Sequence, residues 1–201
     1  MKNYIEFYNK DYYESYGSKG EKYGHHEPWL SHFKKVAEEI VSRYHPRTHV
    51  DAGCAIGVLV NAMREQGVTS YGVDFSSYAI SQANPAWCFQ GNLVILDIIL
   101  ERETGLSFLQ KENPKVDLIT CIEVLEHMPA DEAEIALGAI CYLSDRVIFS
   151  STSEEDGDPT HINVRSQEDW ISSFERHGFS LIADAPYISP WAKVFEYTDH
   201  G

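Results

Sequence analysis

The sequence lacks any apolar run long enough to cross a membrane, which would need about eighteen to twenty consecutive apolar residues. Its first residues, MKNYIEFYNKDYYESYG, also lack the apolar stretch of a secretory signal peptide. These two absences argue against membrane insertion and against secretion. We therefore expect a cytoplasmic protein.

Cysteine and basic residues are also scarce. The four cysteines, Cys54, Cys88, Cys121 and Cys141, are scattered and form no C-x-x-C pair, which favours reduced thiols over a disulfide framework or a thiolate metal site. The 16 lysines and arginines are outnumbered by 31 aspartates and glutamates, so the formal net charge is −15. Such a charge repels phosphate backbones, and no basic cluster offsets it, so a nucleic-acid partner is not expected.

What is present fits a globular domain of ordinary composition. The 201 residues are 43% hydrophobic, which is enough to bury a full core. Residues 1–28 form a tyrosine-rich leader, which we expect either to close over a pocket as a lid or to pack on the domain. Residues 29–201 are expected to form a single domain.

Short β-rich runs alternate with helix-like runs along that domain. Strands are expected near residues 48–52, 70–74, 87–90, 116–121, 145–150, 179–183 and 191–197, and helices near 29–44, 57–67, 77–83, 131–143 and 166–177. The segment 93–115 fits either a strand start or a mostly helical run. The alternation predicts an α/β fold, with a doubly wound, mostly parallel sheet covered by helices on both faces.

The stretch HVDAGCAIG, residues 49–57, has the pattern of a strand that enters a glycine turn before a helix. Gly53 and Gly57 would let the backbone approach a ligand closely. Their spacing is not the G-x-G-x-x-G of dinucleotide-binding loops, so a pyrophosphate cofactor is not favoured. Asp51, inside the same motif, would repel a phosphate but could pair with a cationic ligand.

A second acid, Asp74 in SYGVDFSSYAI, is expected to lie at the end of the next strand. An acid at the end of the second strand can accept hydrogen bonds from both ribose hydroxyls of an adenosine ligand. Together with Asp51, it favours an adenosine that carries a positive charge and no phosphate.

Four segments in this order, VDAGCAIG, YGVDFSSYAI, FQGNL and VDLITCIEVLEHM, resemble the motifs of class I S-adenosylmethionine-dependent methyltransferases. The resemblance covers about residues 48–150 and implies a Rossmann-like, seven-stranded fold with S-adenosylmethionine as methyl donor. It also implies roles by position: Asp51, Gly53 and Gly57 for the methionine portion, Asp74 for the ribose, Phe75 for the adenine face, Asn92 and Leu93 for the adenine amino edge, and Cys121 at the methionine end.

Two residues depart from the family's pattern. Ala55 stands where the family usually has glycine, beside the methionine chain, and its methyl group is tolerable there if its φ is negative. Asn92 stands where the family often has aspartate, and its carbonyl could still accept a hydrogen bond from the adenine amino group. These departures keep open a module that binds the cofactor without catalysis.

The segment CIEVLEHMP places Glu123, Glu126 and His127 at i, i+3 and i+4, so one helical turn would bring all three to one side. They are the catalytic candidates, with His127 as general base because its unperturbed pKa lies near neutrality. Two carboxylates and an imidazole could also hold a divalent ion such as Mg²⁺, with His161 as a fourth ligand.

The same cluster resembles the E-x-x-E-H segment of ubiquinone-pathway O-methyltransferases. With the later histidine, it also resembles the metal-binding set of small-RNA 3′-terminal ribose methyltransferases. The sequence EVLEH also occurs in methyltransferases without metal, so the pattern leaves both readings open. We expect methyl transfer to a small-molecule acceptor, at a hydroxyl or carboxyl oxygen. The alternatives are a metal-dependent RNA ribose methyltransferase, which the negative charge opposes, and the non-catalytic module.

Overall fold

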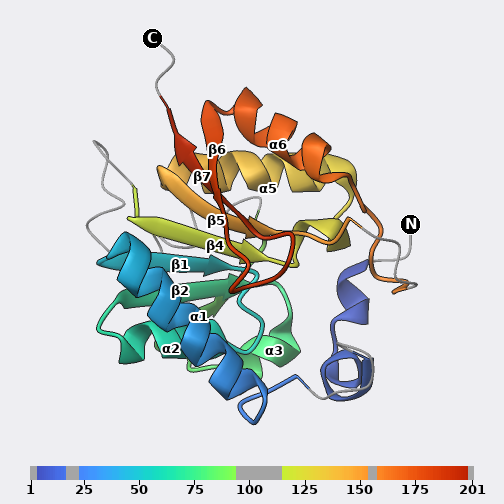
Figure 1. The fold of residues 1–201 in the computed structure, drawn as a ribbon. Coiled ribbons are helices and arrows are strands. Elements are labelled where there is room, and N and C mark those ends of the chain that lie inside the picture. Colours follow the sequence, from blue (N-terminus) through green and yellow to red (C-terminus); the bar gives the residue numbers. More distant parts are fainter. Residues whose placement is uncertain (1–3, 17–22, 94–114, 154–157, 199–201) are drawn as a thin grey trace. The chain divides into compact units, whose positions relative to one another are not determined.

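The computed structural model describes residues 4–16, 23–93, 115–153 and 158–198. The chain divides into two compact units, Met1–Asn92 and Leu93–Gly201 (Figure 1). Most of the segment whose secondary structure the sequence left open, residues 94–114, lies outside the described residues. In the described part of the chain, no helix is long and apolar enough to cross a membrane.

The first unit contains the leader and three parallel strands in the order β3-β2-β1. Its elements are the helical turns η1 (Tyr4–Phe7) and η2 (Tyr12–Tyr16), followed by α1 (Trp29–Tyr44), β1 (Thr48–Ala52), α2 (Val58–Glu65), β2 (Thr69–Asp74), α3 (Ser77–Gln82) and β3 (Cys88–Gln90). Asp51 of β1 lies opposite Gly72 of β2 in the register, so the carboxyl ends of these two strands meet at one edge.

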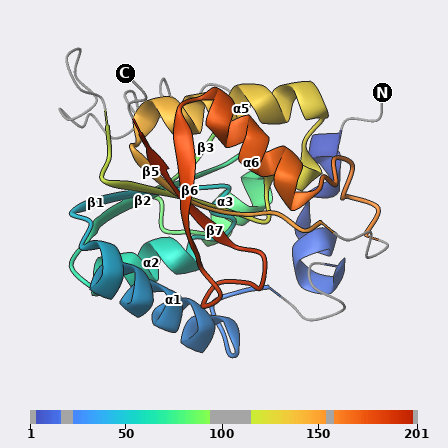
Figure 2. The same ribbon diagram turned by 45° about the horizontal axis from the view of Figure 1, so that its top comes forward.

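The second unit contains four strands in the order β4-β5-β7-β6. Its elements are β4 (Leu118–Ile122), the 3-10 turn η5 (Leu125–His127), α5 (Ala130–Leu143), β5 (Arg146–Ser150), α6 (Gln167–Arg176), β6 (Phe179–Asp184) and β7 (Lys193–Tyr197). β4 and β5 are parallel, whereas β7 runs antiparallel to both β5 and β6. Helices α5 and α6 lie side by side in both views (Figure 1 and Figure 2).

Helix α6 illustrates how the sequence produces these elements. Ser166 caps its first turn by accepting the Asp169 N–H (3.1 Å). Its apolar residues Trp170 and Phe174 are four positions apart and fully buried, where they pack against Phe149 of β5 with ring centroids 5.1 and 5.3 Å away. Burial of one such aromatic side chain stabilises the fold by about 2 kcal/mol.

The seven strands form a mostly parallel sheet, which confirms the predicted α/β fold. The predicted strands and helices that fall within the described residues are present, with ends that differ by up to two residues. The helix expected at 57–67 is shorter, Val58–Glu65, because Gly57 has a φ of 78° and stays outside the helix as its N-cap.

Candidate functional site

The turn between β1 and α2 is hydrogen-bonded to the neighbouring strand β2. The N–H groups of Gly53 and Cys54 both donate to the Val73 carbonyl, at 2.8 and 3.1 Å. Gly57 closes the turn by donating its N–H to the Cys54 carbonyl (2.8 Å). A side chain at Gly57 would have a left-handed backbone and a Cβ only 2.6 Å from Cys88 Sγ, so this position requires glycine.

Ala55 occupies the middle of this turn with a φ of 47°. An alanine was expected to be tolerable here if its φ was negative. The observed φ is positive, so this condition is not met. A left-handed conformation costs an L-residue with a Cβ about 1 to 2 kcal/mol. The Ala55 N–H donates to Asp74 Oδ2 (2.9 Å), and this bond helps to hold the strained residue in place.

The A55G variant is therefore expected to be more stable than the wild type, by about 0.5 to 1 kcal/mol. The relief of the left-handed strain exceeds the extra entropy that glycine gives the unfolded chain. Urea unfolding measures the change, with A52G as the control, because Ala52 is fully buried in β1 and has no positive φ. The control should lose about 1 kcal/mol. Equal losses in both variants would contradict the assignment of strain to Ala55.

Asp74 ends β2 and is only 6% exposed. Its carboxylate accepts two backbone N–H groups, from Ala55 (2.9 Å) and from Ser76 (2.8 Å). Burial raises the pKa of Asp74 to about 6, although both hydrogen bonds act in the opposite direction. At neutral pH this carboxyl group is ionised and oriented, as an acceptor for a ligand's hydroxyl groups must be.

The leader packs against the same turn. Tyr8 and Tyr13 are buried in one apolar cluster with Ile56 and Val58. His25 Nε2 lies 3.0 Å from the Ile56 carbonyl. The described part of the leader therefore forms part of the surroundings of the turn, while its action as a lid stays a prediction.

Two tyrosines of the leader lie near the two predicted acids. Burial, and next the charge of Asp74, raise the pKa of Tyr13 far above its ordinary value. Burial, and next the charge of Asp51, do the same for the pKa of Tyr23. Both phenols therefore keep their protons and can act as hydrogen-bond donors beside carboxylates. The sequence assigned neither residue a place beside these acids, and the only signal was the abundance of tyrosine in the leader.

The predicted adenine-side residues follow the ends of β2 and β3. The Gly91 N–H donates to the Asp74 carbonyl (2.8 Å), which brings the chain before Asn92 next to the end of β2. Phe75 is half-buried, and its ring meets that of Tyr8 edge to face at 5.0 Å. The first unit thus contains seven of the predicted cofactor residues: Asp51, Gly53, Ala55, Gly57, Asp74, Phe75 and Asn92.

The remaining two predicted cofactor residues, Leu93 and Cys121, fall in the second unit, and both are buried. All four cysteines are buried free thiols.

In the second unit, Glu126 is completely buried within η5. The Thr152 N–H approaches its Oε1 at 3.4 Å, whereas Oε2 has no hydrogen-bond partner among the described residues. Burial, and next the charge of Glu123, raise the pKa of Glu126 well above its ordinary value. A buried carboxyl group with an unpartnered oxygen is able to bind a proton, a cation or a polar group of a ligand.

His127 is oriented by a loop that follows β5. Its Nδ1 lies 3.2 Å from the Thr160 carbonyl and 3.1 Å from Thr160 Oγ1. Because the Thr160 hydroxyl donates its own proton to Asp158 (2.6 Å), its oxygen accepts from His127. These contacts favour the tautomer with the proton on Nδ1 and the lone pair on Nε2, which suits a general base or a metal ligand.

His161 comes from the same loop, and its ring centroid lies 4.7 Å from that of His127. One ligand atom from each of Glu126, His127 and His161 can be chosen so that all three lie within 4.8 Å of one another. This separation is compatible with a shared divalent ion. Among the described residues, this is the group of acidic and histidine side chains that the structure brings together.

Glu123 differs from the expectation. It precedes η5 with a φ of 53°, so it does not share one helical turn with Glu126 and His127, although its carboxylate is close enough to Glu126 to raise the pKa of that residue. Its Oε1 accepts hydrogen bonds from the Ser150 hydroxyl and from Trp191 Nε1 (2.7 Å), and it is not part of the three-residue group. No sequence motif pointed to Trp191, which lies in the connection between β6 and β7.

Comparison with known proteins bears on both the residues around Asp74 and the group formed by Glu126, His127 and His161. The model of a family described as a methyltransferase domain matches residues 29–156. A ubiquinone biosynthesis O-methyltransferase from Pasteurella multocida is 32% identical over 108 residues, which are 51% of this chain and 45% of the relative. Another from Nitrosomonas europaea is 31% identical over 116 residues, or 57% and 47% of the two chains. The chain spans about half the length of these curated relatives.

Solved structures share the fold at low identity. One is a magnesium protoporphyrin IX methyltransferase from Synechocystis with bound S-adenosylmethionine. It superposes with a TM-score of 0.64 at 17% identity, and the match covers 96% of this chain and 93% of that protein. An amino pentose methyltransferase from Micromonospora echinaspora, also with S-adenosylmethionine, has a TM-score of 0.64 at 12% identity, with coverages of 86% and 92%. At such identities the likeness shows the fold alone.

Proposed function

Because this chain belongs to the methyltransferase-domain family, we propose that it transfers the methyl group of S-adenosylmethionine to an oxygen atom of a small-molecule acceptor. The observation that carries the proposal is the buried Asp74 carboxylate at the end of β2, which is hydrogen-bonded to the glycine turn after β1. In a sheet of this kind, that edge and that turn are where an adenosine ligand is expected.

The first unit supplies a residue for each part of the cofactor. Asp74 accepts hydrogen bonds from the ribose hydroxyls, Phe75 flanks the adenine ring, and Asn92 accepts from its amino group. The backbone of the turn lines the methionine portion, and Asp51 balances the positive charge of the sulfonium. The roles that the resemblance implies for Leu93 and Cys121 stay predictions.

A small-molecule acceptor and transfer to oxygen fit two further observations. The curated relatives carry names of O-methyltransferases, although the chain spans only about half of their length. The net charge of −15 disfavours an RNA acceptor because it repels the phosphate backbone.

We also propose a cytoplasmic location. The four buried cysteines are free thiols, which fits the reducing conditions of the cytoplasm.

The second unit supplies the acid–base chemistry of the proposal. S-adenosylmethionine supplies an electrophilic methyl group that a nucleophile accepts as the carbon–sulfur bond breaks. His127 takes the proton of the acceptor's hydroxyl group at Nε2, and Thr160 orients its ring. Glu126 either binds a polar group of the acceptor through Oε2 or shares a metal ion with His127 and His161. Burial, and next the charge of Glu123, raise the pKa of Glu126.

A divalent ion such as Mg²⁺ would be held by the same residues, because one ligand atom from each of Glu126, His127 and His161 lies within 4.8 Å of the others, and Glu126 Oε2 has no hydrogen-bond partner among the described residues. Bound there, it would occupy the lone pair of His127 Nε2 and would replace the imidazole in activating the acceptor, because it would lower the pKa of the acceptor hydroxyl group. We expect addition of Mg²⁺ or Mn²⁺ to stimulate methyl transfer in protein treated with EDTA, and E126Q to lose this stimulation. Full activity of EDTA-treated protein without added metal would remove the metal from the proposal.

Cofactor binding should depend on pH through Asp74. Ribose hydroxyls donate to the ionised carboxylate, and the protonated form, present below the pKa of about 6, accepts less well. The affinity for S-adenosylhomocysteine, the demethylated cofactor, is therefore expected to fall by up to about tenfold per pH unit as the pH drops below 6. Calorimetry between pH 5 and 7.5 measures this slope, and D74N should flatten it. An equal slope in D74N would assign the titration to another group.

The test of the proposed function is methyl transfer itself. The protein is incubated with S-adenosylmethionine that carries a deuterated methyl group, and with panels of phenols and carboxylic acids. Mass spectrometry should detect a deuterated methyl ether or ester together with an equal amount of S-adenosylhomocysteine. Tight cofactor binding without product from any acceptor would instead favour the non-catalytic module.

A further inference from the structure

The segment that carries His161 is attached to the segment that carries Glu126 and His127 through Asn163. The Asn163 N–H donates to the Glu126 carbonyl (2.9 Å), and its side-chain Nδ2 donates to the Leu125 carbonyl (3.1 Å). Asn163 is 8% exposed, so these bonds are shielded from water. One asparagine therefore connects two parts of the chain that are more than thirty residues apart.

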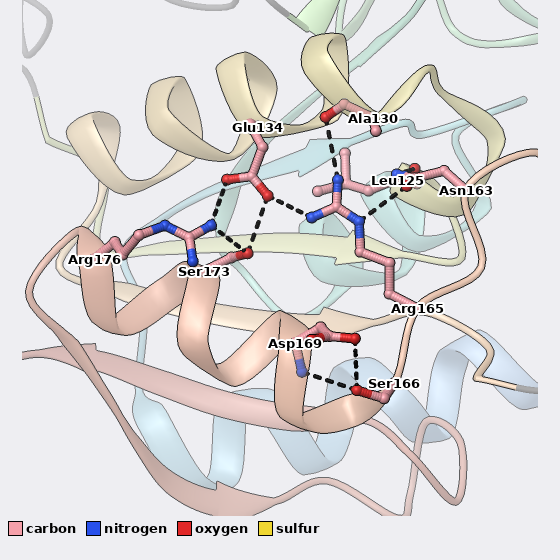
Figure 3. A network of polar contacts seen from close by, with 9 residues as sticks. All are labelled: Leu125, Ala130, Glu134, Asn163, Arg165, Ser166, Asp169, Ser173 and Arg176. Atoms are coloured by element: carbon pink, nitrogen blue, oxygen red, sulfur yellow. Dashed lines mark hydrogen bonds and ion pairs between the residues drawn. The ribbon is translucent and has the colours of Figure 1, made fainter.

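Arg165 fixes the orientation of that asparagine (Figure 3). Its Nε donates to Asn163 Oδ1 (2.9 Å), so the amide must point its Nδ2 toward the Leu125 carbonyl. Its Nη2 donates to the Ala130 carbonyl at the start of α5 (3.1 Å), and its Nη1 pairs with Glu134.

The guanidinium group of Arg165 is also confined by packing. It lies 4.4 Å from the ring centroid of Trp170, which is buried in α6, and the Arg165 side chain is only 17% exposed. The guanidinium group carries its donors on three nitrogen atoms in one rigid plane, so it bonds to a loop, a helix start and a carboxylate at once. A lysine has its three donors on a single nitrogen and cannot match that geometry.

We propose that Arg165 is a positioning residue for the group formed by Glu126, His127 and His161. It acts through Asn163, which it orients, and it touches none of the three. The inference rests on the proposed function, in which these side chains meet the acceptor or a metal ion. Loss of such an orienting contact typically reduces activity or metal affinity by about ten- to a hundredfold.

Arg176 provides a matched control in the same network (Figure 3). It also pairs with Glu134 (3.0 Å), but its other hydrogen bond is to Ser173 within its own helix (2.9 Å). Its side chain is 59% exposed, against 17% for Arg165. R176A therefore removes a guanidinium from Glu134 without affecting Asn163.

The first measurement needs neither activity nor metal. In the wild type, NMR should give cross-relaxation between the ring protons of His127 and His161, whose centroids are 4.7 Å apart, and slow exchange of the Asn163 amide proton. R165A should lose both signals, and R176A should keep both. Retention of both signals in a folded R165A protein would overturn the proposal.

A second variant guards against simple unfolding. R165K keeps a positive charge beside Glu134 but cannot hold Asn163 and Ala130 together. It should stay folded, with the ring contact weakened and the Asn163 amide exchanging faster than in R176A. Wild-type signals in R165K would show that only the charge matters, which would also overturn the proposal.

Kinetics complete the test. R165A and R165K should lower kcat or raise the acceptor KM by about ten- to a hundredfold, while the S-adenosylhomocysteine dissociation constant stays within about twofold of the wild type. R176A should behave like the wild type. If the wild type itself neither binds the cofactor nor transfers methyl groups, the proposed function fails, and the NMR comparison still decides whether Arg165 positions the group.

Discussion

The H127A variant is expected to lose about a hundred- to a thousandfold in kcat, while its affinity for S-adenosylhomocysteine stays within about twofold of the wild type. His127 has its Nδ1 proton committed to Thr160, so its Nε2 can accept the proton of an acceptor hydroxyl group. Removal of the imidazole leaves that proton without an oriented base. Steady-state kinetics with labelled S-adenosylmethionine, together with calorimetry, separate the loss of turnover from any loss of binding.

H177A is the control for this variant. His177 is an exposed histidine at the end of α6, and its replacement should change kcat by less than about twofold. Wild-type turnover in H127A, or an equal loss in H177A, would remove His127 from the role of general base.

The D74A variant is expected to weaken S-adenosylhomocysteine binding by about a hundredfold or more. Hydrogen bonds to a charged group contribute about 1.5 to 3 kcal/mol each, and two ribose hydroxyls lose such a partner. The same change removes the acceptor of the Ala55 N–H, so the turn loses a fixed contact (2.9 Å) as well. Calorimetric titration measures the dissociation constant directly.

D74N separates these two losses. Its amide oxygen can still accept one backbone N–H group, so the turn is largely preserved, while the charge is lost. We expect a smaller loss of affinity than in D74A, about tenfold. D184A serves as a control, because Asp184 is an exposed carboxylate paired with Lys193. Binding by D74A as tight as that of D184A would contradict the placement of the ribose.

The fold was predictable because its signals are local. A strand, a glycine turn and a helix follow one another at residues 48–65, and the position of Gly57 at the helix start follows from the lack of space for a side chain. Ser166 marks the start of α6 in the same way, as a cap whose hydroxyl accepts a nearby N–H group. Patterns of this kind depend on neighbours in sequence, which the sequence displays directly.

The details of the candidate site were less predictable, because they depend on residues distant in sequence. The Glu123 carboxylate accepts a hydrogen bond from Trp191, which is 68 positions later, and its left-handed backbone breaks the helical turn that the spacing from Glu126 suggested. The orientation of His127 depends on Thr160, 33 positions away. No spacing rule in a single sequence encodes these pairs.

Ala55 shows a different limit of sequence reasoning. Its unusual residue type was visible, but the sign of its φ was not, because the turn is shaped by bonds to β2 and to Asp74. The prediction for Arg165 likewise needed the structure, since the residue lies in no motif and acts through Asn163.

The most direct test of the cofactor site is a calorimetric titration of the wild-type protein with S-adenosylhomocysteine at pH 7.5. We expect one molecule bound per chain with a micromolar dissociation constant, and weaker binding in D74A under the same conditions. An absence of binding heat at millimolar ligand, supported by an unchanged unfolding temperature, would contradict the central claim that the turn after β1 and the carboxylate of Asp74 form a cofactor site.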